Sequence, residues 1–209
     1  MSQTTAGPLV VYADYVCPFC FLGYESLNRY QEGRATPVAV EWHPYDLRSR
    51  QRDSDGEIDP SVDNGKDEEY YENARRNVER LADQYDVEMG QSLDRSVDSF
   101  DTQRVAYAAA DDHPEAFEAF HRGVFDALWR NGRDIGDPAV LEELAIDAGL
   151  PDGYVTETLE DDDTHEALES AFAAAQSRRI TGVPTFLYGE HAARGAVPPD
   201  HLRRLVEGE

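Results

Sequence analysis

Two cysteines, Cys17 and Cys20, are the only cysteines in this 209-residue chain, and two residues separate them. They lie in the segment V-V-Y-A-D-Y-V-C-P-F-C-F, residues 10–21. A thiolate at one position can attack a substrate sulfur, and the second thiol can then resolve the mixed disulfide. The spacing therefore predicts redox chemistry with Cys17 as nucleophile and Cys20 as resolving thiol.

The elements around the two thiols support this order. An apolar run, residues 9–12, predicts a strand, and the apolar spacing from Phe21 to Tyr30 predicts a helix. Unpaired N–H groups and the helix dipole stabilise an anion such as a thiolate at a helix start. Pro18 suits the first helical turn, where no N–H is required. We therefore expect Cys17 to be exposed at the helix start, with Cys20 one turn further in.

The cysteine pair is open to two other interpretations. A Cys-x-x-Cys pair can be half of a zinc site, which needs two more ligands. The chain has no other cysteine, and no two of its six histidines are three to five residues apart. The pair can also be structural, but a disulfide framework is not expected in a reducing compartment. Redox chemistry is favoured over both, and no metal site is predicted.

The charge of the chain is unusually negative. Lys and Arg total 19 against 43 Asp and Glu, a formal net charge of −24, and Lys66 is the only lysine. Acidic residues occur along nearly the whole chain, so they indicate a property of the surface and not a patch for a basic partner. Such a surface needs screening by salt, which predicts a salt-adapted, haloarchaeal protein. Nucleic acid and anionic membranes are excluded as partners.

The N-terminal sequence M-S-Q-T-T-A-G-P has neither a basic nor an apolar region of the kind found in signal peptides. No apolar run reaches the ~18 residues that a membrane span requires. A cytoplasmic location is therefore expected.

After the first predicted helix, residues 37–43 alternate apolar and polar side chains and predict a second strand. Strand, helix and strand form a βαβ unit with parallel strands. Residues 45–66 are polar and aperiodic and are expected to be a loop. Helical spacing and caps then predict six helices, at residues 66–86, 99–111, 114–130, 138–148, 153–159 and 163–178.

The apolar stripes of these helices are interpreted as core. One stripe comprises Tyr70, Ala74, Val78, Leu81 and Tyr85. His121 and His165 have no partner in register on their helices and are interpreted as ordinary histidines.

The strand pattern returns after Ile180. Residues 186–188 and 191–194 predict a β-hairpin, and Pro198-Pro199 opens a last helix. Both ends of the chain thus carry strands, with helices between them. We predict an α/β fold with a discontinuous domain, residues 8–65 and 180–209, interrupted by a helical insertion at residues 66–179.

A βα unit with C-P-F-C at its junction and a later T-G-V-P-T (181–185) before a hairpin and helix resembles the thioredoxin fold. The large all-helical insertion is similar to that of the DsbA-like branch. Further similarity to the FrnE-like subfamily lies in three segments, W-H-P-Y-D-L (42–47), G-R-D-I-G-D-P (132–138) and G-A-V-P-P (195–199).

The resemblance implies roles for six residues. Cys17 and Cys20 match the attacking and resolving thiols, and Pro184 matches a cis-proline beside them, although an X-Pro bond is cis in only about 5% of cases. Pro18, Phe19 and Val183 complete the expected substrate-binding set, with the Val183 backbone pairing with an extended peptide. The alternative for Pro184 is an ordinary trans-proline at a strand start.

One departure from the family concerns Phe19, because many relatives carry His or Trp there. A neutral ring adds no positive charge to stabilise the thiolate. We therefore expect the Cys17–Cys20 pair to be less oxidising than the cysteine pair of periplasmic DsbA, whose redox potential is about −120 mV.

These observations predict a thiol-disulfide oxidoreductase that acts on protein or low-molecular-weight thiol and disulfide substrates, with an unidentified redox partner. It is expected to need no metal or organic cofactor and to be a monomer or homodimer. One alternative is a glutathione-dependent isomerase or transferase, against which Cys17 and Cys20 argue. Another is a redox-switched binding or chaperone module with an aromatic groove, formed by Tyr70, Tyr71, Tyr85, Phe100 and Trp129.

Overall fold

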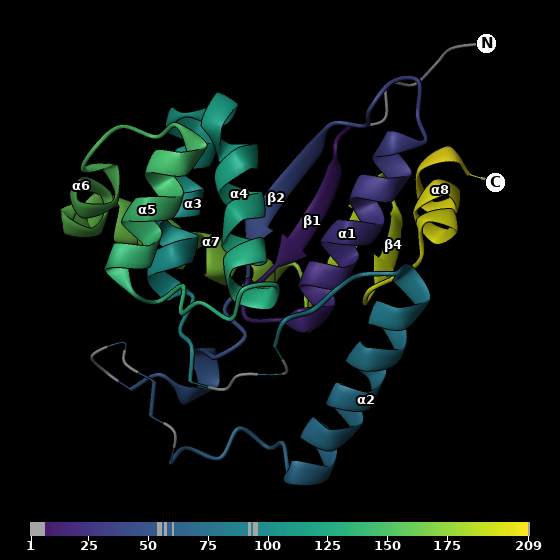
Figure 1. Cartoon of the computed structure of the whole chain (residues 1–209), viewed down its shortest axis with the longest axis horizontal. Coiled ribbons are helices and arrows are strands. Elements are labelled where there is room, and N and C mark those ends of the chain that lie inside the picture. Colours follow the sequence, from purple (N-terminus) through teal and green to yellow (C-terminus); the bar gives the residue numbers. More distant parts are fainter. Residues whose placement is uncertain are drawn as a thin grey trace.

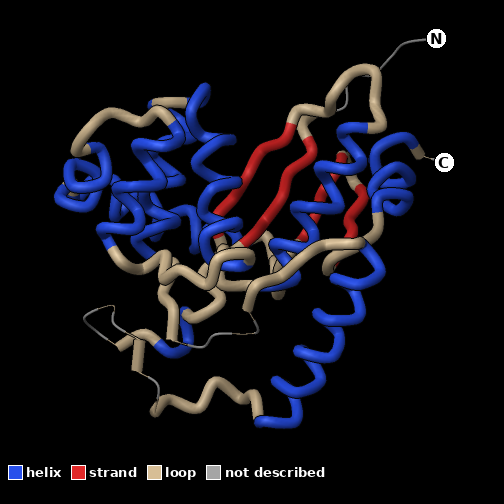
Figure 2. The backbone as a smooth tube through the Cα atoms, in the orientation of Figure 1, coloured by secondary structure: helices blue, strands red, loops and turns tan. Residues whose placement is uncertain are grey.

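The structure is a computed structural model that describes residues 7–53, 56, 58–59, 61–91, 93 and 96–208. Four strands form one mixed sheet: β1 (Leu9–Ala13), β2 (Val40–Pro44), β3 (Thr185–Tyr188) and β4 (His191–Arg194). Their order is β2-β1-β3-β4, with β1 parallel to β2 and antiparallel to β3 (Figure 2). The strands of the N-terminal and C-terminal segments therefore meet at the centre of the sheet.

Helices cover both faces of the sheet (Figure 1). α1 (Pro18–Glu32) packs against α8 (Pro199–Glu207), which contacts β4. On this side Val11, Phe186 and Leu202 share one core cluster. α7 (Asp162–Ser177) contacts β2. Alternate side chains, such as Tyr12, pack there with Ala175 of α7.

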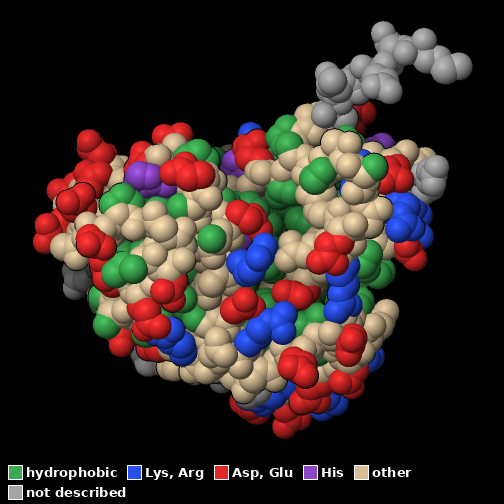
Figure 3. Space-filling view, turned by 45° about the horizontal axis from the view of Figure 1, so that its top comes forward, with side chains coloured by type: hydrophobic (Ala, Val, Ile, Leu, Met, Phe, Trp, Pro, Cys, Tyr) green, Lys and Arg blue, Asp and Glu red, His purple; other side chains and the backbone are tan. Residues whose placement is uncertain are grey.

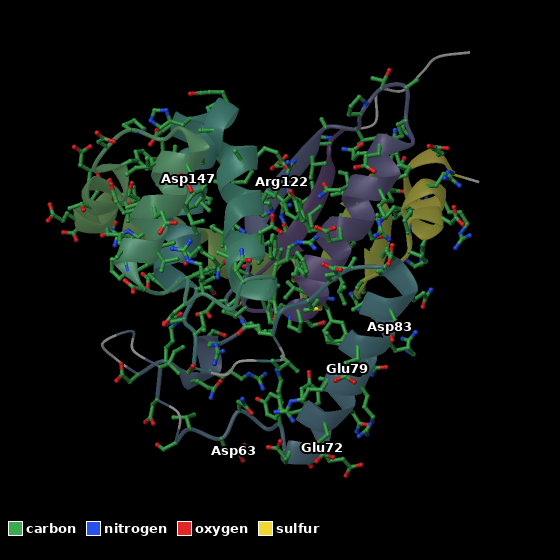
Figure 4. The ribbon with its side chains drawn as sticks, viewed as in Figure 1. Asp63, Glu72, Glu79, Asp83, Arg122 and Asp147 are labelled. Carbon is green, nitrogen blue, oxygen red and sulfur yellow. The ribbon has the colours of Figure 1, made fainter. Side chains whose placement is uncertain are left out.

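A bundle of four helices lies beyond the β2 edge of the sheet: α3 (Phe100–Asp112), α4 (Pro114–Trp129), α5 (Pro138–Ala148) and α6 (Tyr154–Glu160) (Figure 1). Arg122 of α4 joins the bundle to α1, since its Nε donates to the Tyr24 hydroxyl at 3.3 Å (Figure 4). α2 (Glu68–Tyr85) lies apart from the bundle and contacts α1. The division into two domains stays a prediction. The two helices at the ends of the predicted insertion contact the other part of the chain, α2 through α1 and α7 through β2.

Most predicted elements lie where the sequence places them, with three differences. β2 begins at Val40 and not at residue 37. Within the predicted loop 45–66, a short 3-10 helix, η1, spans Ser49–Gln51, and residues 54, 55, 57 and 60 lie outside the described part. Of the two neighbouring tyrosines on α2, Tyr71 is the buried one, while Tyr70 of the predicted stripe is 48% exposed.

The predicted aromatic groove is not present as one surface. Tyr71, Tyr85 and Trp129 are buried, whereas Tyr70 is exposed. Trp129 fixes the backbone before the cysteines, because its indole N–H donates to the Tyr15 carbonyl at 2.8 Å. Three of these rings therefore belong to the hydrophobic core, and the five residues do not form a common surface.

Acidic side chains cover much of the visible surface (Figure 3). Glu72, Glu79 and Asp83 are exposed on α2 (Figure 4). The acidic run at 161–163 begins α7, where the Asp161 carboxylate accepts the Asp163 N–H, as the helix dipole favours. None of the helices in the described residues is both long and apolar enough to cross a membrane.

Candidate active site

Cys17 is the N-cap residue of α1, directly after the loop that follows β1. Its carbonyl accepts the N–H groups of Cys20 at 2.9 Å and Phe21 at 3.3 Å. Pro18 occupies the first helical position and is buried. The predicted junction of strand and helix is therefore present, with the first thiol at the positive end of the helix dipole.

The Cys17 side chain differs from the expectation of an exposed nucleophile, because only 4% of its surface is accessible. Its Sγ lies 3.7 Å from the carbonyl oxygen of Val183, to which the thiol donates. The loop before β3 thus covers the sulfur. A substrate must therefore displace the Val183 carbonyl from Cys17 or reach the sulfur from the side of this hydrogen bond.

The Val183-Pro184 peptide bond is cis, as the resemblance implied. The loop is closed by the Thr185 hydroxyl, which donates to the Gly182 carbonyl at 2.7 Å. The Gly195 N–H donates to the Pro184 carbonyl at 2.8 Å and ties the loop to the end of β4. In the described part of the chain the Val183 N–H has no hydrogen-bond partner.

α1 approaches this loop closely at Gly23. A Cβ atom at Gly23 would lie 3.1 Å from Pro184 Cγ and 3.3 Å from Phe186 Cζ. A side chain at this position would push against the loop. Gly23 therefore allows the helix that carries both thiols to pack on the cis-proline.

Cys20 is 1% exposed and lies in the first turn of α1, three residues after Cys17. Burial raises the pKa of its thiol well above the usual value, and the hydrogen bond with Cys17 raises it further. The thiol form of Cys20 is thereby stabilised, so its attack on a mixed disulfide requires a group that accepts its proton.

Asp14 is a buried carboxyl group near the thiols that was not predicted from the sequence as part of the site. It is 1% exposed and accepts the Leu47 N–H at 2.8 Å, the Val16 N–H at 3.2 Å and the Ser99 hydroxyl at 2.5 Å. Burial raises its pKa to about 6, although these hydrogen bonds oppose the shift. Asp14 also acts on Cys20 in two opposed ways, since a hydrogen bond with its backbone lowers the pKa of that thiol and its charge raises it. The available signal was one acidic residue inside the apolar run before the cysteines.

Tyr15, next to Asp14, connects the loop to α4. Its hydroxyl lies 2.7 Å from Nδ1 of His121. His121, interpreted from sequence as an ordinary histidine, is 3% exposed and has this long-range partner.

Of the six residues that the sequence singled out, Cys17 and Val183 are in direct contact, and the Cys17 thiol raises the pKa of Cys20; both cysteines are free thiols. Phe19 is half-buried and packs on the core cluster that contains both cysteines. Pro18, which follows Cys17, and Pro184, which follows Val183, are both buried.

A cavity of about 270 Å³ is lined by Val16, which precedes Cys17, and by Thr181, two positions before Val183. Three basic residues, Arg48, Arg50 and Lys66, and one acidic residue, Asp46, also line it. In a chain with 19 basic and 43 acidic residues, such a grouping makes this cavity locally favourable for an anion. Among the described residues, no group of three or more His, Cys, Asp or Glu is placed to hold a metal ion.

Comparison with known proteins agrees with this architecture. The family described as DSBA-like thioredoxin domain matches residues 8–207. The uncharacterized protein YwbO of Bacillus subtilis is 29% identical over 218 residues, which cover 95% of each chain.

Solved structures share the fold, and two of them are given as examples. The probable DsbA oxidoreductase SCO1869 from Streptomyces coelicolor superposes with a TM-score of 0.78 at 21% identity, covering 96% of this chain and 88% of that one. A 2-hydroxychromene-2-carboxylate isomerase superposes with a TM-score of 0.72 at 19% identity, covering 94% and 91%. The predicted α/β fold with a helical insertion is confirmed as a DsbA-like thioredoxin fold.

Proposed function

Because the chain belongs to the DSBA-like thioredoxin domain family, we propose that it is a thiol-disulfide oxidoreductase that uses Cys17 and Cys20. The observation that carries the proposal is the contact of the Cys17 sulfur with the carbonyl of Val183, beside a cis-proline and in front of a second thiol. This arrangement supplies a nucleophile, a resolving thiol and a backbone segment for the substrate.

In the reducing direction, the Cys17 thiolate attacks one sulfur of a substrate disulfide. A Cys17–substrate disulfide forms, and the other substrate sulfur leaves as a thiolate that takes up a proton. Cys20 then loses its proton and attacks Cys17, and the second substrate sulfur leaves. Two electrons pass to the substrate and the Cys17–Cys20 disulfide remains. The oxidising direction is the reverse.

Asp14 is the proposed acceptor for the proton of Cys20, either directly or through a water molecule. With a pKa of about 6 its carboxyl group is largely ionised at neutral pH, and it is close enough to act electrostatically on Cys20. A proton acceptor with a pKa near the working pH is effective in general base catalysis. The raised pKa of Cys20 makes this help necessary.

The N–H of Val183, which has no hydrogen-bond partner among the described residues, supports substrate pairing. An extended peptide that places its disulfide over Cys17 can accept this N–H with a backbone carbonyl, which adds a short strand to the loop. Pro18 and Phe19 then border the substrate on the side of α1.

Cysteine variants test the proposal. Cys20→Ser is expected to accumulate a mixed disulfide between Cys17 and a peptide substrate, detected by mass under non-reducing conditions. Cys17→Ser is expected to form none and to lose turnover, because the remaining thiol is covered. Full turnover in both variants would contradict the mechanism.

A second candidate is a glutathione-dependent isomerase. The cavity with Arg48, Arg50 and Lys66 favours a small thiol that carries carboxylates, as glutathione does. The structural similarity to an isomerase is at the level of the fold. Binding of reduced glutathione to Cys20→Ser, with isomerisation but no disulfide exchange by the unmodified protein, would favour this candidate.

The finer assignments rest on the sequence. We propose a FrnE-like, haloarchaeal protein of the cytoplasm, supported by the quoted motifs and by the net charge of −24. Protein or low-molecular-weight thiols are its proposed substrates, and a separate redox partner recycles the pair. A domain at 8–65 and 180–209, with an insertion at 66–179, and a monomeric or homodimeric state remain part of this proposal.

A further inference from the structure

A second cavity, of about 510 Å³, lies between β2 and helices α3 and α4. Seven aromatic or imidazole side chains line it, those of Tyr15, Trp42, His43, Tyr107, Phe117, His121 and Phe125. Neither cysteine, nor Val183 or Pro184, is among its lining residues. Its volume is within the range of sites for small organic molecules. The cavity is therefore distinct from the dithiol site.

Among these seven side chains, only His121 carries a polar atom that is both buried and without a hydrogen-bond partner in the described part of the chain. The side chain is 3% exposed, and its Nδ1 is occupied by the Tyr15 hydroxyl at 2.7 Å. Within the described part of the chain, its Nε2 has no hydrogen-bond partner. A buried polar atom without a partner is unfavourable and calls for a ligand or a water molecule.

The state of His121 determines which partner Nε2 requires. Burial lowers the pKa of the imidazole to about 3, so the ring is neutral at physiological pH. Burial also raises the pKa of Tyr15, whose hydroxyl keeps its proton. When that hydroxyl donates to Nδ1, the histidine proton resides on Nε2. Nε2–H is then a donor that needs an acceptor.

The walls determine the shape of the ligand. The rings of Trp42, Phe117 and Phe125 pack around that of His121, with centroid distances of 4.3, 5.3 and 5.1 Å. Because these rings also line the cavity, its walls are largely aromatic, which favours an aromatic ligand.

The charged residues that line the cavity determine which ligand charge it favours. Glu41 and Asp111 line the cavity, and His43 is bonded to Glu41 at 2.7 Å. No Lys or Arg of the described residues lines it. With a net charge of −24 on the chain, an anionic ligand is disfavoured.

We propose that this cavity binds an uncharged, planar aromatic molecule that carries a carbonyl or similar acceptor, which receives the Nε2–H of His121. The aromatic walls supply affinity, and the single donor selects for the acceptor. This site goes beyond disulfide exchange, since its ligand does not need a sulfur atom.

Two matched probes test the proposal: 2-acetonaphthone, which has a carbonyl group, and 2-ethylnaphthalene, which has the same rings without one. Binding is followed by calorimetry and by the nitrogen chemical shifts of the Trp42 indole and His121 in molar KCl. The ketone is expected to bind saturably and about tenfold more tightly than the hydrocarbon, the difference that one buried hydrogen bond supplies. The Nε2 resonance of His121 should shift only with the ketone.

Ala110, exposed on α3, lines the same cavity and offers a matched pair of variants. Ala110→Trp should block binding of both probes, and Ala110→Ser should leave it unchanged. Disulfide exchange by both variants shows that they are folded. In the double variant Tyr15→Phe, His121→Phe, which removes both polar groups, the two probes should bind equally.

The proposal is overturned if neither probe binds saturably, in which case Nε2 bonds to water only. It is also overturned if the ketone has no advantage over the hydrocarbon in the unmodified protein, or if Ala110→Trp binds both probes as Ala110→Ser does.

Discussion

Asp14 and His121 are two buried ionisable side chains on either side of Tyr15, and their surroundings differ. Both oxygens of Asp14 are engaged, by Leu47, Val16 and Ser99. Only one nitrogen of His121 is engaged, by Tyr15. A fully bonded carboxyl group holds the loop before Cys17 in one conformation and can act on the thiols. A half-bonded imidazole at a cavity marks a place for a ligand.

The largest expected contrast between the two sites is in stability. At pH 4, where Asp14 carries its proton in the folded protein, Asp14→Ala leaves three donors without an acceptor, at about 1–3 kcal/mol each, so the free energy of unfolding should fall by more than about 3 kcal/mol. At pH 7, where His121 is neutral, His121→Phe removes one hydrogen bond but also one unpaired nitrogen, and should change the free energy of unfolding by about 1 kcal/mol. Urea unfolding in molar KCl measures both. Equal losses would mean that the two sites do not differ in their bonding.

The pH dependence of stability should be of opposite sign at the two sites. The pKa of Asp14 is raised from 3.8 to about 6 on folding, so its contribution is complete below about pH 4 and is lost as the pH rises through 6. The pKa of His121 is lowered from 6.5 to about 3, so stability is lost as the pH falls below 6.5. Each slope is about 1.4 kcal/mol per pH unit, and between pH 4 and 6 they oppose each other.

Two variants separate these slopes. Relative to the unmodified protein, Asp14→Asn should gain about 3 kcal/mol between pH 4 and 6 as the pH rises. His121→Phe should gain a similar amount as the pH falls from 6.5 to 4. Urea unfolding at several pH values in molar KCl checks both. Parallel curves for the two variants would refute the assigned directions of the pKa shifts.

The smallest expected effect concerns Phe19, which places a neutral ring beside the thiols. Phe19→His introduces a positive charge that stabilises the Cys17 thiolate, and should make the couple more oxidising by about 30 mV, or 1.4 kcal/mol. Phe19→Leu is the matched neutral control and should shift the potential less. A less oxidising Phe19→His variant would show that electrostatics at this position do not control the couple.

Local sequence signals predicted the elements well where a cap or a periodicity was present. Asp137 caps α5 and Gly149 ends it in the left-handed conformation, as the Asp-Pro and Ala-Gly pairs indicated. The hairpin before α8 was likewise read from its turn. Such signals fail where two neighbouring residues have the same character, because Tyr70 and Tyr71 differ only in the face of α2 on which they fall.

The two buried groups could not be predicted in the same way. The role of Asp14 depends on Leu47 and Ser99, and that of His121 on Tyr15, which lies 106 positions away. Burial shifts a pKa only once these distant segments meet. The cysteine spacing was visible in the sequence, whereas the covering of Cys17 by Val183 required the structure.

The central claim, that Cys17 and Cys20 form a reversible redox pair, is tested most directly by titrating both thiols in protein equilibrated across glutathione redox buffers in molar KCl. We predict one two-electron transition, at a potential more negative than the roughly −120 mV of DsbA. That potential also gives the direction of exchange, since about −270 mV is typical of the reductant thioredoxin. Two thiols that stay reduced in the most oxidising buffer would contradict the claim.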